Sequence, residues 1–421
     1  MITSQKIKWI LSMPLFLWCL NLLGQGQQLL HLDSCLIRAE NNYPLIRQYD
    51  LLSKAHDFNM SNLQKGKLPQ LMISGQASYQ SAVTSLPTAG SPVLSKDQYK
   101  LYGEIVQPLT DLMVINHQKK IAQIGHEIDQ RQVEVQLYDI KERVSELFFG
   151  ILLLQNQQAQ IELTQRNLES GLKTIAAAVT HGTALKSSAD LLKAELLTLQ
   201  QKMTEIQAAK LAYSKMLGLF VDQELSVEIL LVTPQVIALE STINRPELSL
   251  FDARSRAFDV QSELINKNNL PKFNLFLQSG WGRPALNFLS NDFEPFYIGG
   301  LRLSWRLSNY YSSSGQKQIY ALNQQQIDTE RSTFLFNTNL QLNSHFIEID
   351  KMDQLIQQDE QIVDLREQII STAKEQLAQG VITSNDYKSA VLDADQARQK
   401  RLFHEIELIR IKNRYKLTSG N

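Results

Sequence analysis

Apolar side chains recur every three or four residues over very long stretches of this chain. That spacing predicts helices with a single apolar stripe, similar to those of coiled coils. No proline lies between Leu109 and Thr233, or from Phe296 to the end of the chain. A helix from Asp111 to about position 180 would be roughly 100 Å long at 1.5 Å per residue, far longer than a compact core needs. The stripes consist of Val133, Leu137, Ile140, Val144, Leu147, Phe148 and Ile151 in the first half, and Leu355, Ile362, Leu365, Ile369, Ala373 and Leu377 in the second.

Four shorter segments alternate between apolar and polar residues, which predicts strands near 71–82, 98–107, 273–283 and 296–307. In the last of them Leu301, Leu303, Trp305 and Leu307 oppose Arg302, Ser304, Arg306 and Ser308. Strands of about ten residues with one apolar face and aromatic ends are typical of an outer-membrane barrel. A soluble sandwich fits the alternation equally well. The proline-containing segments Ser81–Asp97 and Arg283–Glu294 are predicted to be surface loops, on the extracellular side of a barrel.

Four strands cannot close a barrel, and an open sheet edge is not tolerated in lipid. If the strands cross a membrane, several copies of the chain must therefore pool them.

The chain also matches itself when it is shifted by 202 residues, which places Pro44 on Pro246 and Pro69 on Pro271. Each half has the same order: a helical stretch, two strands, a very long helix and a medium helix. We therefore predict a first repeat over 27–220, a linker or equatorial segment over 221–243, and a second repeat over 244–421. The first helical stretch is expected from Leu32 to Gly66, and its counterpart from Arg245 to Asn268.

The N-terminus has the pattern of a secretory signal, predicted over 1–26. Lys6 and Lys8 precede an apolar run from Trp9 to Leu23, and small and polar residues follow. A buried N-terminal helix is the alternative. Removal of this segment would take Cys19 with it and leave Cys35 as the only thiol, so no intrachain disulfide is expected.

The 42 basic and 43 acidic residues nearly cancel, which argues against nucleic acid as a partner. The chain contains no His-Glu-x-x-His, Cys-x-x-Cys, Gly-x-Ser-x-Gly or phosphate-loop pattern. We therefore expect no metal, no cofactor and no enzymatic activity.

Several short segments resemble the TolC family of outer-membrane efflux proteins, also called outer membrane factors. Together with the duplication they cover nearly the whole mature chain. The segments are Leu32–Leu36 with Ala39–Pro44 in the opening helix, Gly103–Leu109 at a strand-to-helix junction, Gly182 with Asp190–Ala194, and Gly380–Tyr387.

The resemblance implies a fold that is mainly α with a membrane β-barrel part. Three copies would build a twelve-stranded barrel, four strands from each subunit, above a trimeric α-barrel tunnel in the periplasm. It also implies passive export in a tripartite efflux or type I secretion system. The partners would be a periplasmic adaptor (membrane fusion) protein and an inner-membrane pump of RND or ABC type. A periplasmic coiled-coil scaffold without a membrane barrel is the alternative.

The resemblance also points to the turns that precede the medium helices. Gly182 and Gly380 would let the chain turn where adaptor tips make contact. In the family, the tunnel tip can carry two acidic positions three residues apart; Asp386 matches the first, but Ser389 stands at the second. A single ring of Asp386 is one reading, with Asp190 as its counterpart in the first repeat.

Helix capping alone is the other reading of these acids. Thr383 and Asp386 fit a capping box, in which a hydroxyl and an acid three residues later satisfy the first amides of a helix, and Ser187 with Asp190 repeats the pattern. On the strands, Lys100, Glu104, Arg302 and Arg306 are candidates for the barrel lumen; ordinary solvation is the alternative for them. At the second junction Arg306 replaces Pro108, so that turn is expected to be built differently.

Overall fold

The computed structural model describes residues 29–84, 94–226, 228–235 and 239–421. The predicted signal segment 1–26 lies outside the described residues, as does the middle of the predicted loop Ser81–Asp97. The chain forms two compact units. One, called the sheet unit here, comprises 44–138, 242–341 and 418–421; the other, the tip unit, comprises the chain up to Tyr43, 139–241 and 342–417.

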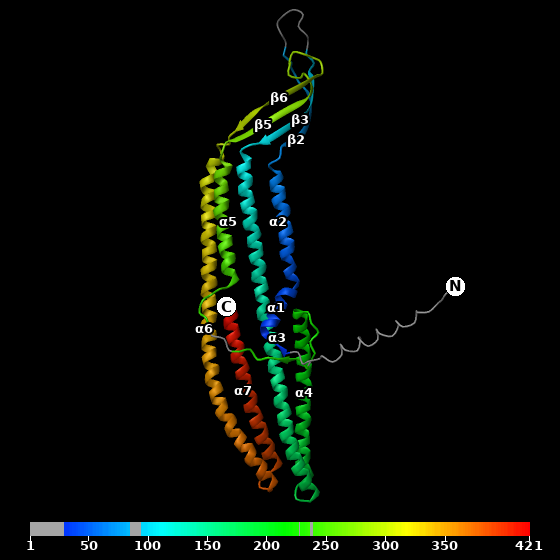
Figure 1. The fold of residues 1–421 in the computed structure, drawn as a ribbon, viewed down its shortest axis with the longest axis vertical. Coiled ribbons are helices and arrows are strands. Elements are labelled where there is room, and N and C mark those ends of the chain that lie inside the picture. Colours follow the sequence, from blue (N-terminus) through cyan, green and yellow to red (C-terminus); the bar gives the residue numbers. More distant parts are fainter. Residues whose placement is uncertain (1–28, 85–93, 227, 236–238) are drawn as a thin grey trace, which may run out of the picture. The chain divides into compact units, whose positions relative to one another are not determined.

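The sheet unit contains four long strands that form one antiparallel sheet in the order β2-β3-β5-β6 (Figure 1). The short helix η1 (Pro44–Ile46), α2 (Arg47–Lys65) and α5 (Pro246–Asn268) belong to this unit, with the first parts of α3 (Asp111–Thr180) and α6 (Asn309–Ala378). Pro246 begins α5, where its missing N–H is not needed. The strands are β2 (Gln70–Tyr79), β3 (Asp97–Pro108), β5 (Lys272–Arg283) and β6 (Glu294–Ser304).

The tip unit contains α1 (Leu32–Asn42), α4 (Lys186–Val221), α7 (Ser384–Ser419) and the later parts of α3 and α6. Two short parallel strands, β1 (Leu29–Leu30) and β4 (Leu230–Leu231), pair with each other in this unit. A core of apolar side chains joins α3, α4, α6 and α7; Leu168, Leu192 and Val391 are fully buried in it. Among the described residues, no helix has both the length and the apolar character that a membrane crossing requires.

The two predicted stripes behave differently. Most of the first-half stripe is buried, Val144, Phe148 and Ile151 completely. In the second half Ala373 and Leu377 are buried, but Ile362, Leu365 and Ile369 are exposed on α6. Apolar residues at helical spacing that find no partner within the chain leave a surface that another molecule can cover.

The predicted order of elements is confirmed in both halves. Helices α3 and α6 have 70 residues each, and α4 and α7 have 36 each. The offset between repeats is 202 residues at Pro69 and Pro271, and falls to 198 at Asp111 and Asn309, because the second inter-strand loop is shorter. The predicted helical stretch from Leu32 to Gly66 is present but is not one continuous helix. Tyr43 is extended (ψ 132°) because Pro44 disfavours a helical conformation in the residue before it, so the chain breaks into α1, η1 and α2.

Candidate functional site

The pairing register of the sheet separates its two faces. Leu71 pairs with Ile105, which pairs with Leu277, so their side chains point to the same face. All large apolar residues on this face are exposed, between 39% and 84%. They are Leu71, Ile73, Tyr79, Tyr99, Leu101, Ile105, Phe273, Leu275, Leu277, Trp281, Tyr297, Leu301 and Leu303. A free apolar face of this size needs a cover, because soluble proteins rarely leave such a patch in water.

Aromatic residues gather at the loop end of that face. Tyr79 ends β2, Tyr99 is near the start of β3, and Trp281 and Tyr297 lie in the neighbouring strands. Tyrosine and tryptophan favour the boundary between lipid and water, where the ring is in an apolar environment and the polar atom is wet. The loop end of the sheet therefore has the composition of a membrane boundary.

The opposite face is polar and more enclosed. Lys100, Glu104 and Arg302 all point to it, as the pairs Lys100–Gly282, Glu104–Gln278 and Asn274–Arg302 require. Arg302 Nη2 lies 3.2 Å from Glu104 Oε1. Glu104 and Phe296 are buried on this face, although Met72 and Ile298 are exposed there, while every large apolar residue on the other face is exposed. A sheet that curves toward its polar side would produce this difference in burial, and we call that side the concave face.

Arg306 does not lie on the sheet, since β6 ends at Ser304 rather than near 307. The indole N–H of Trp305 donates to the Asn269 carbonyl (3.0 Å), and the backbone then turns into α6. The first junction differs, because β3 continues to Pro108 before α3 begins. Arg306 is thus a turn residue, and the expectation that the two junctions differ is confirmed.

The turns that precede α4 and α7 share one backbone geometry. Gly182 and Gly380 have φ values of +72° and +73°, a conformation that glycine adopts without strain. The amide of Gly182 donates to the Val179 carbonyl and that of Thr183 to the Ala178 carbonyl; Gly380 and Val381 make the matching bonds to Leu377 and Gln376. These pairs of bonds form a Schellman motif at the end of each 70-residue helix.

Asp386 takes part in a complete capping box at the start of α7. Its carboxylate accepts hydrogen bonds from the Thr383 hydroxyl (2.7 Å) and amide (3.0 Å), and the Asp386 amide donates to the Thr383 hydroxyl (3.2 Å). These bonds from Thr383 lower the pKa of the Asp386 carboxyl. The side chain is exposed, so it presents a fixed negative charge at the tip.

The expected repeat of this box in the first half is wrong. The residue before α4 is Leu185, which makes no side-chain capping bond, and Ser187 lies inside the helix. Aligned from the two turn glycines, Ser188 is the counterpart of Asp386, and Asp190 corresponds to Lys388. Asp190 instead lies 3.7 Å from Lys193 on the helix surface. The two acids are therefore not equivalent positions of the repeat.

The pattern did not reveal a buried polar contact between α3 and α7. Asp395 accepts hydrogen bonds from the Thr164 hydroxyl (2.5 Å) and from the Gln160 amide (3.1 Å). Its repeat counterpart in α4 is exposed Leu197, so this contact belongs to the α3–α7 pair alone. The signal that the sequence offered for this contact was Asp395 itself, an acidic residue on the side of α7 that faces the core.

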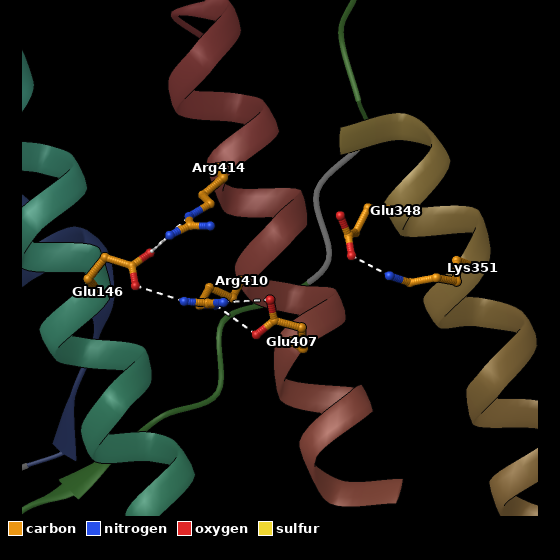
Figure 2. A network of polar contacts seen from close by, with 6 residues as sticks. All are labelled: Glu146, Glu348, Lys351, Glu407, Arg410 and Arg414. Atoms are coloured by element: carbon orange, nitrogen blue, oxygen red, sulfur yellow. Dashed lines mark hydrogen bonds and ion pairs between the residues drawn. The ribbon is translucent and has the colours of Figure 1, made fainter. Parts of the chain in front are cut away.

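A second set of charges joins α3 and α7, farther from the turns at Gly182 and Gly380 (Figure 2). Glu146 of α3 accepts from Arg410 Nη1 (2.8 Å) and Arg414 Nε (2.9 Å) of α7, and Arg410 also binds Glu407 (2.6 and 2.8 Å). Lys351 contacts Glu348 on α6. Within the described residues, no group of three or more metal-binding side chains comes together. The Glu146 contacts join α3 to α7, whereas Arg410–Glu407 and Lys351–Glu348 are pairs within one helix.

Comparison with solved structures identifies the fold. VceC, an outer-membrane protein of Vibrio cholerae, matches 93% of this chain and 96% of its own at 13% identity (TM-score 0.67). CusC, whose structures concern transmembrane channel formation, matches over 93% and 92% at 12% identity (TM-score 0.70). The CmeC outer-membrane channel of Campylobacter jejuni matches over 92% and 85% at 12% identity (TM-score 0.64).

No protein-family model and no curated protein matches the chain. The chain has the fold of the outer-membrane channel proteins along nearly its whole length. The fold that the sequence resemblance implies is therefore confirmed.

Proposed function

We propose that this protein is one subunit of a trimeric outer-membrane duct through which solutes leave the periplasm passively. The observation that carries the proposal is the two-faced sheet, which has an uncovered apolar face and a concave polar face. Lipid would cover the apolar face, and water would fill the concave side. The fold shared with outer-membrane channels supports the same role.

The edges of the sheet support assembly from several copies. Strands β2 and β6 are its two edges, and neither has a second neighbour among the described residues. In lipid, every backbone polar group needs a partner, so β6 of one copy would pair with β2 of the next. Three copies would give the twelve strands of a closed barrel.

The duplication predicts the register of that pairing. Gln70 pairs with Val106 in the first hairpin, and their repeat counterparts Lys272 and Ser304 pair in the second. Between the repeats, Val106 pairs with Phe276. The repeat counterpart of Val106 is Ser304, and that of Phe276 is Ser74. The same register between two copies therefore places Ser304 of one copy opposite Ser74 of the next.

A cysteine cross-link tests this arrangement. In cells that carry Ser74→Cys with Ser304→Cys, oxidation should yield covalent dimers and trimers in the outer membrane, because directly opposite residues suit a disulfide. The matched control, Ser78→Cys with Ser304→Cys, places the thiols about 13 Å out of register and should not cross-link. The native thiol is a poor competitor, since burial raises the pKa of Cys35 to about 12.

If the protein leaves the membrane fraction on carbonate washing and no cross-link forms, the duct proposal fails. The alternative, a periplasmic scaffold, predicts that soluble outcome. As part of the proposal, residues 1–26 form a cleaved export signal, 27–220 and 244–421 the two repeats, and 221–243 the equatorial linker. N-terminal sequencing of the mature chain tests the cleavage.

The tips of the helix pairs α3–α4 and α6–α7 are the proposed docking site for a periplasmic adaptor, which would connect the duct to an RND or ABC pump in the inner membrane. The turns at Gly182 and Gly380 supply two similar loops per subunit for that contact. Asp386 is the proposed gate charge, repeated three times in a trimer. Energy would come from the pump, so we assign no catalytic role to this chain.

A further inference from the structure

An ion pair crosses a whole strand on the concave face of the sheet. Arg302 is on β6 and Glu104 on β3, and β5 lies between these two strands. Strands two positions apart are separated by about 10 Å, so both side chains must reach over β5 to meet. The guanidinium of Arg302 passes over the ring of Phe276 on β5, 4.5 Å from its centre. The pair is thus a strap that holds Arg302 in place above the sheet.

The two charges of the strap are unequally accessible. The Glu104 side chain is 9% exposed, whereas the Arg302 side chain is 48% exposed. Water and any solute on the concave side therefore have far more contact with the Arg302 guanidinium than with the Glu104 carboxylate. Although the pair is neutral overall, the face that it presents is positive.

A second cation lies on the same face. The Lys100 ammonium is 5.5 Å from the centre of the Phe296 ring, which also contacts Tyr102 at 6.3 Å between ring centres. Rings attract a cation over their faces, so Phe296 holds Lys100 as Phe276 holds Arg302. The register places one more cation and one more carboxylate on this face, Lys272 beside Asp111 (3.1 Å) and Glu294 beside the Ser290 hydroxyl (3.0 Å). Each subunit therefore presents three cations, two of them supported by rings, against two carboxylates, and one of these carboxylates is shielded beneath Arg302.

We infer that the barrel segment of the duct is selective for anionic solutes, and that Arg302 and Lys100 determine this preference. The inference rests on the proposed function, because it requires the concave face to become a lumen. A closed barrel of twelve strands would be about 24 Å across between backbones, given the strand spacing and tilt. Side chains that extend about 6 Å inward would then act on the axis from within a Debye length, about 8–10 Å.

The test is the reversal potential of purified trimers in planar lipid bilayers under a potassium chloride gradient. Arg302→Gln combined with Lys100→Gln should shift the reversal potential toward cation selectivity relative to the unmodified protein. Arg302→Lys keeps the charge and should leave it unchanged. Arg256→Gln, which removes an exposed cation from helix α5, is the matched control and should also leave it unchanged.

The outcomes separate this inference from the proposed function. If no bilayer current appears with the unmodified protein, both the duct and the inference fail. If currents appear but the Arg302 and Lys100 variants leave the reversal potential unchanged, only the inference fails. If Arg302→Gln prevents assembly, Lys100→Gln alone decides the question, because Lys100 is not part of the strap.

Discussion

The ring of Tyr387 on α7 lies directly against Gly171 on α3, where a methyl group would come within 2.3 Å of the ring. The Tyr387 side chain is 1% exposed, and its hydroxyl donates to the Asn167 carbonyl (2.9 Å). Asp386, the proposed gate charge, is the preceding residue. This contact therefore fixes the start of α7 on α3 next to the tip.

Gly171→Ala should destabilise the protein, because the new methyl group and the hydrogen-bonded ring cannot occupy the same space. Overpacking of this kind costs about 1–3 kcal/mol. The measurement is thermal unfolding of the purified protein in detergent. Gly125→Ala is the control in the same helix, since nothing lies within 4 Å of the added carbon there. The control should be neutral or slightly stabilising. Equal effects of the two variants would contradict the proposed close contact.

Asp386→Asn should weaken the start of α7, because it removes the charge that accepts both Thr383 hydrogen bonds. Asp190→Asn should not weaken the start of α4 in the same way, since Asp190 caps no helix. Because the carboxyl pKa is lower in the folded state, its stabilising effect is full above the ordinary value of 3.8 and is lost as the pH falls through the folded value. Amide hydrogen exchange at residues 384–388 measures the effect.

Capping and gating at Asp386 can be separated by Asp386→Glu, which keeps much of the capping while moving the charge. If Asp386 also forms the gate, bilayer conductance and its block by multivalent cations should change in both Asp386→Glu and Asp386→Asn. Unchanged conductance and block in both variants would leave capping as the only role.

The tip unit should lose stability at mildly acidic pH through His345. Burial and the Arg414 guanidinium lower the pKa of His345 from its usual 6.5, while Glu348 and Glu142 act in the opposite direction. A base with a lowered pKa binds its proton more readily after unfolding. The contribution of neutral His345 to the free energy of unfolding is therefore full above pH 6.5, and it is lost as the pH falls through the folded pKa. Melting temperatures between pH 8 and 5 should fall less in His345→Gln than in the unmodified protein, with exposed His181→Gln as the control.

Ile369→Asp should prevent assembly without unfolding the subunit. Ile369 is exposed on α6, and its repeat counterpart is Gly171, which contacts α7 inside the chain. By the repeat, the exposed face of α6 should contact α4 of a neighbouring copy. Cross-linking should detect monomers while circular dichroism stays helical. Lys374→Asp is a control for charge on the same helix. Intact trimers of Ile369→Asp would contradict this interface.

The sequence predicted the long helices, the two-faced strands and the duplication, because each depends on local periodicity and on proline. It was less reliable wherever two distant segments meet. The end of β6 was misplaced because the Trp305 side chain binds the Asn269 carbonyl, a contact that alternation along the strand does not reveal. Asp190 was matched to Asp386 because the two local patterns are similar, whereas the turn glycines show that Ser188 is the equivalent residue.

By itself, the sequence determined which elements form and which strand faces are apolar, since backbone sterics and side-chain periodicity act within a few residues. Only the tertiary structure decided which charges meet and which remain accessible. The strap from Arg302 over Phe276 to Glu104 joins positions almost 200 residues apart. Such a contact depends on strand order and sheet curvature, and both arise only when the two repeats pack together.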